Sequence, residues 1–218
     1  MKTKYYTINN IDKQARAYID ELASFRKYHS IDLKRKNIAL LVIDMQKYFT
    51  DPESHAMIPS APAIMPKIKQ LQDYFISNNL EVLQTRHINN ERNAKMMDKW
   101  WSDVITKGNP LSEICDDLKD KRIKPVIKSQ YDAFHETNLD SEFKAKNIKQ
   151  VVITGVATHL CCETTARSAF MRGFEVFLAV DCIATWREDF HRATLLNISH
   201  GFAVPVLSSE IILTMERK

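Results

Sequence analysis

The hydrophobic and polar positions along this chain predict strands that alternate with helices. Stretches with the pattern of strands occur at residues 38–45, 81–87, 124–129, 151–153, 175–182 and 203–208. The first of them is a continuous apolar run, as expected of a strand buried on both faces of a sheet. Apolar residues at the three-to-four-residue spacing of an amphipathic helix occur at 64–75, 138–146, 158–173 and 188–200, with a closing helix after the last strand. Strands that alternate with helices predict a parallel sheet with right-handed crossovers and helices on both faces.

The regions outside this alternation are the N-terminus and the segment 88–120. Apolar residues at helical spacing predict one amphipathic helix over residues 10–27, which packs onto the main body as an extension. The segment 88–120 contains helical fragments, and its pattern does not place it in the fold. The fold class that follows is α/β: a three-layer α/β/α sandwich with a six-stranded parallel sheet and an N-terminal extension helix. We assign residues 1–36 to the extension and residues 37–218 to the main domain.

Composition narrows the functional classes. With 218 residues the chain is long enough for one domain with a full core. Its 31 basic and 27 acidic residues are spread along the chain, which predicts no nucleic-acid partner. The cysteines lack metal-site spacing, the N-terminus lacks the apolar core of a signal peptide, and the longest apolar runs are far shorter than the roughly 20 residues of a membrane span. We expect a reduced, cytoplasmic protein with no membrane partner.

Side chains able to do chemistry follow several of the predicted strands. Asp44 ends the first, His87 the second and Lys128 the third, while Gly155 breaks the chain between the fourth strand and Cys161. In open parallel sheets, ligands bind at the carboxyl ends of the strands where the strand order reverses. A carboxylate, an imidazole, an amine and a thiol are therefore expected to share one crevice.

The stretch from Gln150 to Gly173 places two adjacent cysteines where a strand gives way to a helix. If Thr158 is the N-cap of that helix, Cys161 lies in its first turn. Free backbone N–H groups and the positive end of the helix dipole meet there and favour the thiolate, which is the nucleophilic form. Cys162 points about 100° away around the helix and is expected to serve only in packing.

Three stretches in this order resemble the isochorismatase-like cysteine hydrolase family: LLVIDMQ (40–46), VIKSQYDAF (126–134) and GVATHLCCETTARSA (155–169). The resemblance covers roughly residues 38–212 and implies a Rossmann-like sheet. It also implies hydrolysis of a C–N bond in a small molecule, of amide, ureido or carbamoyl type, through a cysteine thioester. The catalytic residues it implies are Asp44, Lys128 and Cys161.

The same resemblance implies a cis peptide bond between Val156 and Ala157, and an oxyanion hole formed by the backbone N–H groups of Ala157 and Cys161. The residues expected to bind substrate are Gln46, Phe49, His87, Trp101, Tyr131 and Val156. Of the neighbouring Trp100 and Trp101, one is expected in the core and the other in the pocket wall. Family members often form homo-oligomers, so a dimer or tetramer is expected.

One stretch departs from the pattern of the members that hydrolyse nicotinamide. Those members have an Asp-x-His metal site after the second strand, where this chain reads TRHINN (85–90). His87 stands at the Asp position and Asn89 at the His position. Because a lone imidazole is a poor site for a dication, we predict no metal and no cofactor. His87 then serves either to bind substrate or in the structure.

Three other functions are alternatives to C–N bond hydrolysis. The N-terminal helix and the DMQKYF stretch (44–49) are similar to the true isochorismatases, which cleave a vinyl ether with the Asp and the Lys and do not need the cysteine. A non-catalytic binding or scaffold module is a second alternative, and the complete set of Asp44, Lys128 and Cys161 argues against it. An NAD-dependent oxidoreductase lacks support, because no G-x-G-x-x-G follows the first strand.

Overall fold

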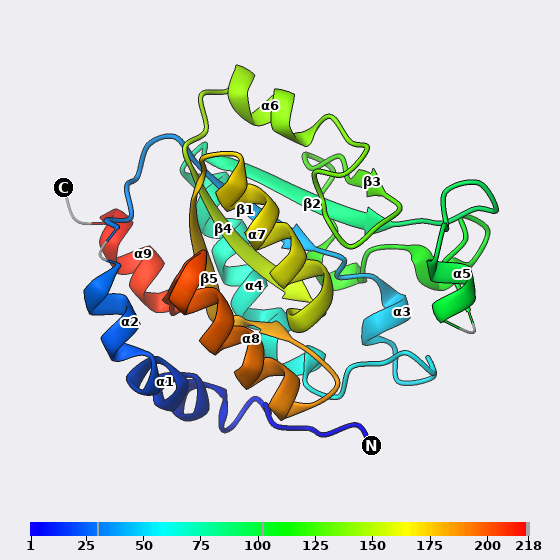
Figure 1. The fold of residues 1–218 in the computed structure, drawn as a ribbon, viewed down its shortest axis with the longest axis horizontal. Helices are drawn as coiled ribbons and strands as arrows, with labels where there is room; N and C mark the ends of the chain where they lie inside the picture. The colour runs from blue at the N-terminus through cyan, green and yellow to red at the C-terminus, as the bar shows by residue number, and fades with distance from the viewer. Residues whose placement is uncertain (30, 102, 217–218) are drawn as a thin grey trace.

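The structure, a computed structural model, describes residues 1–29, 31–101 and 103–216. In this part of the chain, six strands form one parallel sheet in the order β3-β2-β1-β4-β5-β6 (Figure 1). The strands are β1 (Ile38–Ile43), β2 (Glu81–His87), β3 (Val126–Lys128), β4 (Gln150–Val156), β5 (Glu175–Ala184) and β6 (Val204–Val206). The predicted α/β class and the six parallel strands are confirmed.

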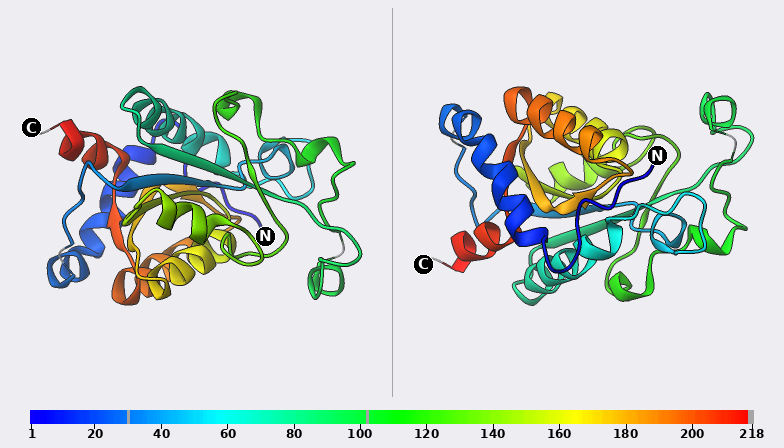
Figure 2. Two further views of the ribbon diagram at one scale, coloured as in Figure 1. Left: turned by 90° about the horizontal axis from the view of Figure 1, so that it is seen from above. Right: turned by 90° about the horizontal axis from the view of Figure 1, so that it is seen from below.

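Helices cover both faces of the sheet and make the three layers (Figure 2). One face carries α4 (Ala61–Ser77) and α9 (Ser208–Glu216). The other carries α6 (Leu139–Ala145), α7 (Glu163–Met171) and α8 (Glu188–Gly201). The apolar stripe of α4 shows why the helical spacing was informative: Ile64, Ile68, Leu71 and Phe75 are all fully buried against the sheet.

The strand order reverses between β1 and β4, and this reversal positions the candidate site. The chain runs outward from β1 through β2 to β3, then returns to place β4 on the other side of β1. Every residue of β1 and β4 is buried, as expected of central strands. Ligand crevices open beside such a reversal, at the carboxyl ends of the two strands. In this protein those ends lead into Asp44 and into the turn that carries Cys161.

The N-terminal region differs from its prediction as a single helix. It forms α1 (Ile11–Glu21) and α2 (Ala23–Tyr28), which are separated at Leu22. Leu22 is buried and its backbone leaves the helical conformation, while no residue of α2 is fully buried. Helix α1 packs on β5 and is tied to both layers by ion pairs, from Asp12 to Lys67 of α4 at 2.5 Å and from Glu21 to Arg192 of α8 at 2.7 Å.

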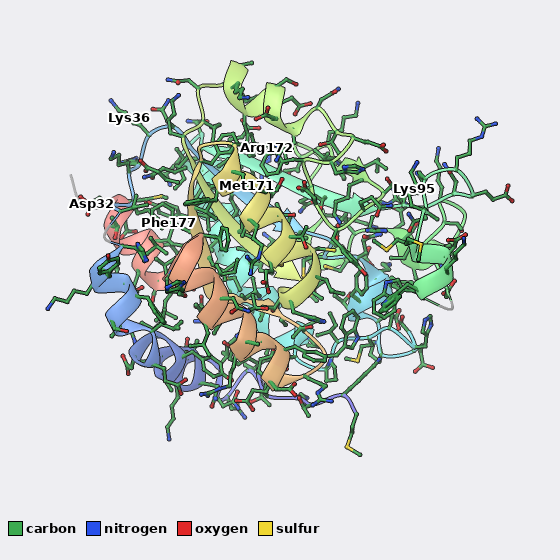
Figure 3. The ribbon with its side chains drawn as sticks, viewed as in Figure 1. Asp32, Lys36, Lys95, Met171, Arg172 and Phe177 are labelled. Carbon is green, nitrogen blue, oxygen red and sulfur yellow. The ribbon has the colours of Figure 1, made fainter. Side chains whose placement is uncertain are left out.

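The described part of segment 88–120 contains short helices and projects beyond the sheet (Figures 1 and 2). It includes α5 (Met97–Trp100) and the 3-10 turns η1 (Pro110–Ser112) and η2 (Asp116–Leu118), and it lies near the short helix α3 (Lys47–Thr50). Figure 3 shows Lys95 on this projection, at the opposite side of the molecule from Asp32 and Lys36 of the linker before β1. Among the described residues, no helix has both the length and the apolarity to cross a membrane.

Gly155 is a position where the backbones of β1 and β4 approach too closely for a side chain. Its φ is +106°, and a Cβ built there would lie 2.0 Å from the carbonyl oxygen of Ile43. We expect Gly155→Ala to lower the free energy of unfolding by about 3 kcal/mol, because it adds a backbone clash to an unfavourable φ. Urea denaturation followed by circular dichroism measures this change.

The matched control is Gly108→Ala, where a Cβ meets no atom within 4 Å and φ is not in the left-handed region. That variant is expected to stay within about 0.5 kcal/mol of the parent protein. Equal stability of the two variants would contradict the close approach of β1 and β4.

Candidate active site

Asp44 follows β1 directly and is held in one orientation by its neighbours. Its backbone lies in the left-handed region, with φ at +48°, and its side chain is completely buried. The Thr85 hydroxyl accepts a hydrogen bond from the Asp44 amide at 3.0 Å and donates one to Asp44 Oδ1 at 2.6 Å. Thr85, which lies on β2, was not identified from the sequence. The second carboxylate oxygen is left to face Lys128.

Lys128 ends β3 and brings its ammonium group into the middle of the predicted residues. Its Nζ lies 2.7 Å from Asp44 Oδ2, 3.4 Å from Cys161 Sγ and 3.4 Å from His87 Nδ1. The carbonyl oxygen of Gln130 accepts a further hydrogen bond at 2.8 Å. Burial opposes the ammonium charge, but the carboxylate of Asp44 outweighs this effect, so the pKa of Lys128 is raised. The four strand-end groups predicted to share one crevice do lie together.

His87 forms a pair with Asn89. Asn89 Nδ2 donates to the carbonyl oxygen of Ser129 at 2.9 Å, which leaves Asn89 Oδ1 to accept from His87 Nε2 at 2.8 Å. His87 therefore carries its proton on Nε2 and turns the lone pair of Nδ1 toward the Lys128 ammonium. Burial, followed by the nearby Lys128 charge, lowers the pKa of His87 to about 4, so the ring is neutral at pH 7.

These positions do not fit a metal ion. In the described part of the chain, Asp44, His87 and Cys161 are the group whose potential ligand atoms lie close enough, within 4.8 Å of one another. The Lys128 ammonium already contacts all three of them. An additional dication there would be repelled by this buried charge, and His87 Nε2 is occupied by Asn89.

The turn that carries Cys161 begins where β4 ends. The bond between Val156 and Ala157 is cis, as the family resemblance implied. A π-helical turn, η3 (Thr158–Cys162), follows and leads into α7. The carbonyl oxygen of Ala157 accepts hydrogen bonds from the amides of Leu160 at 3.1 Å and Cys162 at 3.2 Å, which fixes the shape of the turn.

The prediction that Thr158 is the N-cap of the helix is wrong. Ala157 occupies the cap position without a side-chain hydrogen bond, and Thr158 is already inside the turn. The hydroxyl of Thr158 instead lies 3.2 Å from Nδ1 of His191 on α8. The cause is the π-helical geometry, which starts one residue earlier than an α-helix capped by Thr158 would.

The expectation that the helix start favours the thiolate form of Cys161 is also wrong. Burial raises the pKa of Cys161 to about 12, with Lys128 lowering it and Asp44 raising it. The free N–H groups at the start of the helix do not offset the cost of placing a negative sulfur in a site shielded from water. Cys161 is thus a neutral thiol, which would need a base to become a nucleophile. Cys162 is completely buried, its sulfur 3.9 Å from the Thr154 carbonyl oxygen, which agrees with its predicted packing role.

A cavity of about 350 Å³ opens beside Cys161. Six of the predicted site residues line it: Phe49, His87, Trp101, Tyr131, Ala157 and Cys161. The Trp101 indole N–H donates to the Tyr131 hydroxyl at 2.8 Å and joins two sides of the wall. Asp44 and Lys128 lie behind the cysteine, outside this lining.

Two predicted substrate contacts are not part of the cavity wall. Gln46 is fully buried, and its side-chain amide bonds to the backbone. Its Nε2 donates to the carbonyl oxygens of His87 and Ser112, and its Oε1 accepts from the backbone N–H of His87. Val156 is buried in β4. Trp100, one of the two candidates for the core, is 74% exposed. Gln46 therefore fixes the end of β2, and Trp100 does not pack in the core.

Several lining residues were not identified from the sequence. They come from the N-terminus, α3 and the loop after it, the projecting segment, η3 and the loop before α8: Lys2, Tyr48, His55, Ala56, Asn89, Met97, Asp103, Val104, Ile105, Leu160 and Trp186. In the sequence, the tryptophans at 100–101 and the polar residues at 85–90 were the features that indicated part of this wall. The remainder comes from loops without periodicity, which tertiary structure alone brings together.

This chain is similar to known proteins over most of its length. A sequence model of a protein family, described as Isochorismatase domain, matches residues 38–210. Nicotinamidase 3 of Arabidopsis thaliana is 37% identical over 188 residues, which are 83% of this chain and 91% of that protein. Enterobactin synthase component B of Escherichia coli (strain K12) is 28% identical over 177 residues, 80% of this chain and 62% of that protein.

A crystal structure of a cysteine hydrolase from Pseudomonas syringae pv. phaseolicola 1448A has the same fold. It superposes with a TM-score of 0.80 at 24% identity and covers 84% of this chain and 94% of that one. The expected fold is confirmed by this likeness.

The arrangement around Lys128 predicts that the protein does not retain a divalent metal. We expect less than stoichiometric zinc after incubation with the ion and gel filtration, because the ammonium contacts all three candidate ligands. Elemental analysis by mass spectrometry measures the retained ion. One zinc per chain, lost on Cys161→Ala, would show that the ammonium gives way to the metal.

The raised pKa of Cys161 predicts the pH dependence of its alkylation. The rate with iodoacetamide should keep rising up to pH 9.5, by about tenfold per pH unit where the thiolate is the reacting form, because the thiol pKa lies near 12. Peptide mass spectrometry at timed intervals follows Cys161 separately from the buried Cys115. A plateau near pH 7 would mean that the thiolate already exists at rest.

Proposed function

This chain belongs to the isochorismatase family, and on that premise we propose that it hydrolyses a C–N bond of a small amide, ureido or carbamoyl compound through a thioester on Cys161. The observation that carries the proposal is the contact chain at the cavity wall. Cys161 Sγ lines the cavity and lies 3.4 Å from Lys128 Nζ, which lies 2.7 Å from Asp44 Oδ2. A nucleophile, a cation and a base are then within reach of one bound carbonyl group.

In the first step, Cys161 Sγ attacks the carbonyl carbon and forms a C–S bond. The thiol proton passes to the Asp44 carboxylate, which is needed as a base because burial keeps the resting thiol protonated. The carbonyl electrons move onto oxygen and give a tetrahedral oxyanion. The backbone N–H groups of Ala157 and Cys161 are the proposed donors to this oxyanion, and losing one such donor costs about 10²–10³ in rate in other enzymes.

In the second step, the intermediate collapses and the C–N bond breaks. Asp44 returns the proton to the leaving nitrogen, which departs as ammonia or an amine. Water then attacks the thioester, giving its proton to Asp44, and collapse of the second oxyanion releases the acid and the thiolate. Asp44 finally reprotonates Cys161. Lys128 keeps its charge throughout, because the Asp44 carboxylate, or the oxyanion that replaces its charge, raises the pKa of Lys128 against the effect of burial.

The cavity supports a small substrate with a flat apolar part. Phe49, Trp101, Tyr131 and Trp186 supply aromatic wall area within about 350 Å³. The 37% identity to Nicotinamidase 3 supports an amide as the cleaved group. His87, neutral and lining the same wall, is proposed to contact the substrate.

The vinyl ether chemistry of the true isochorismatases is the second candidate. The observation that favours it is that the Asp44–Lys128 ion pair is complete without the sulfur. The placement of Cys161 at the cavity wall favours the C–N reaction instead, because a sulfur that does no chemistry need not face the substrate.

We also propose a reducing, cytoplasmic location and a homo-oligomer, either dimer or tetramer. Four buried free cysteines support the first. Exposed apolar side chains such as Trp100, Met171 and Leu196 support the second. A monomer mass in sedimentation equilibrium would contradict the oligomer.

A substrate panel with matched cysteine variants tests the reaction class. Nicotinamide, N-carbamoyl compounds, ureido acids and isochorismate are offered to the parent protein, to Cys161→Ala and to Cys162→Ala, and product formation is followed by liquid chromatography. We expect C–N hydrolysis in the parent, a loss of at least about 10³-fold in kcat for Cys161→Ala, and retained activity for Cys162→Ala.

Other outcomes of the panel separate the alternatives. Turnover of isochorismate that survives Cys161→Ala would establish the vinyl ether reaction in place of the thioester. A folded parent protein that is inactive on every compound would favour the non-catalytic module.

A further inference from the structure

The first ten residues, here called the N-terminal segment, precede the family match at residue 38 yet lie against the candidate site. In Figure 1 the segment passes below α8. Lys2 lines the cavity, and its Nζ donates to the carbonyl oxygen of Met57 at 2.9 Å. The Thr3 amide donates to the Trp186 carbonyl oxygen at 2.7 Å, and its hydroxyl accepts from the Glu188 amide at 3.1 Å. The segment thus connects two loops that carry the cavity wall.

Two tyrosines anchor the segment in the protein interior. The amides of Tyr5 and Tyr6 both donate to Ser60 Oγ at 3.1 Å, next to the start of α4. The Tyr5 hydroxyl accepts from the Thr185 amide at 3.0 Å, and the Tyr6 hydroxyl donates to the Val180 carbonyl oxygen at 3.1 Å. Both side chains are buried. Each hydroxyl therefore reaches β5 or the residue that follows it.

The rings of these tyrosines enclose His191 of α8. The imidazole is completely buried, with ring centroids 5.0 Å from Tyr5, 5.4 Å from Tyr6 and 5.3 Å from Tyr18. Burial lowers the pKa of His191 to about 3, so the ring is neutral under ordinary conditions. A neutral imidazole has one donor and one acceptor nitrogen, and both have partners here.

The partners of His191 link the N-terminal segment to the cysteine turn. Nε2 lies 3.3 Å from the Tyr6 hydroxyl, and Nδ1 lies 3.2 Å from Thr158 Oγ1. Because the Tyr6 hydroxyl donates to Val180, its oxygen accepts from His191 Nε2–H, and Nδ1 is left to accept the Thr158 proton. Thr158 begins η3, is adjacent to Ala157 and precedes Cys161 by one turn.

We propose that Tyr6 and His191 are positioning residues of the active site, which hold Thr158 and through it the turn that carries Cys161. The turn has its own internal bonds at the Ala157 carbonyl, and the hydrogen bond to His191 fixes its Thr158 side chain. Loss of that bond lets the amides of Ala157 and Cys161 move relative to Asp44. The role of these amides in catalysis rests on the proposed function, whereas their immobilisation does not.

Tyr6→Phe tests the inference, with Tyr18→Phe as its matched control. Both changes remove one hydroxyl from the same aromatic cluster, but the Tyr18 hydroxyl donates to Glu188 and not to His191. Hydrogen exchange of the 156–163 region, followed by mass spectrometry, is expected to become faster in Tyr6→Phe and to match the parent in Tyr18→Phe. In the same samples, Tyr6→Phe should slow iodoacetamide labelling of Cys161 by about tenfold. It should also lower kcat by about tenfold on the substrate found by the panel, and change KM by less than about twofold.

A second variant keeps the test decisive if Tyr6→Phe does not fold. Thr158→Val removes the other end of the same hydrogen-bonded chain with little change in shape. Its effect on exchange should match that of Tyr6→Phe, and the double variant should be no worse than either single one, because the two act through one connection. Additive effects of Tyr6→Phe and Thr158→Val, or equal exchange in Tyr6→Phe and Tyr18→Phe, would overturn the inference.

Failure of the proposed function has a different signature. In that case Cys161→Ala keeps the activity of the parent, while the exchange measurements still decide whether Tyr6 holds the turn. Faster exchange in Tyr6→Phe with an unchanged labelling rate would mean that the turn moves without displacing the sulfur, and it would overturn the positioning role.

Discussion

The buried ion pair of Lys128 and Asp44 is the interaction on which the site depends. Neither side chain is exposed, and each buried ion costs several kcal/mol of lost hydration unless other groups compensate for it. Thr85, the Gln130 carbonyl and His87 Nδ1 supply that compensation. These groups sit on or just after β2 and β3, while Asp44 follows β1, so the pair is satisfied only when the three strands are in register. The chemistry of the site is therefore a consequence of sheet assembly.

The same burial determines how charge moves during the proposed reaction. At rest, one ammonium faces one carboxylate, and the thiol is neutral. When the thiol proton passes to Asp44, the negative charge moves from the carboxylate to the new oxyanion. The total charge around Lys128 stays constant, so no additional ion has to be buried at the transition state. A resting thiolate would have required a second buried negative charge, which explains why the raised thiol pKa is compatible with a nucleophilic role.

The sequence predicted the strands, and with them Asp44, His87, Lys128 and Cys161, because apolar runs and strand ends are local patterns. The predictions from sequence failed where residues distant in the chain determine the property, such as the protonation state of a thiol or the partner of a hydroxyl. The resting state of the thiol depends on burial by surrounding elements, which the position in a helix does not reveal. Thr158 looked like a cap, whereas its hydroxyl partner is 33 residues away on another helix. The projecting segment and the loop after α3 lack periodicity, so their contribution to the cavity wall had no local signal.

The π-helical turn that carries Cys161 makes side-chain hydrogen bonds with elements outside the turn. Such turns are short and often functional, and their hydrogen bonds do not continue regularly into the next helix. Here the side chains on either side of Cys161 are tied elsewhere: Thr158 to His191 of α8, and Thr165 to the Ala133 amide in the loop after β3. His191 Nε2 in turn lies 3.3 Å from the hydroxyl of Tyr6, which belongs to the same hydrophobic core as the strands although it lies outside the family match. The contacts that reach the turn carrying Cys161 thus extend beyond the residues that the family model matches.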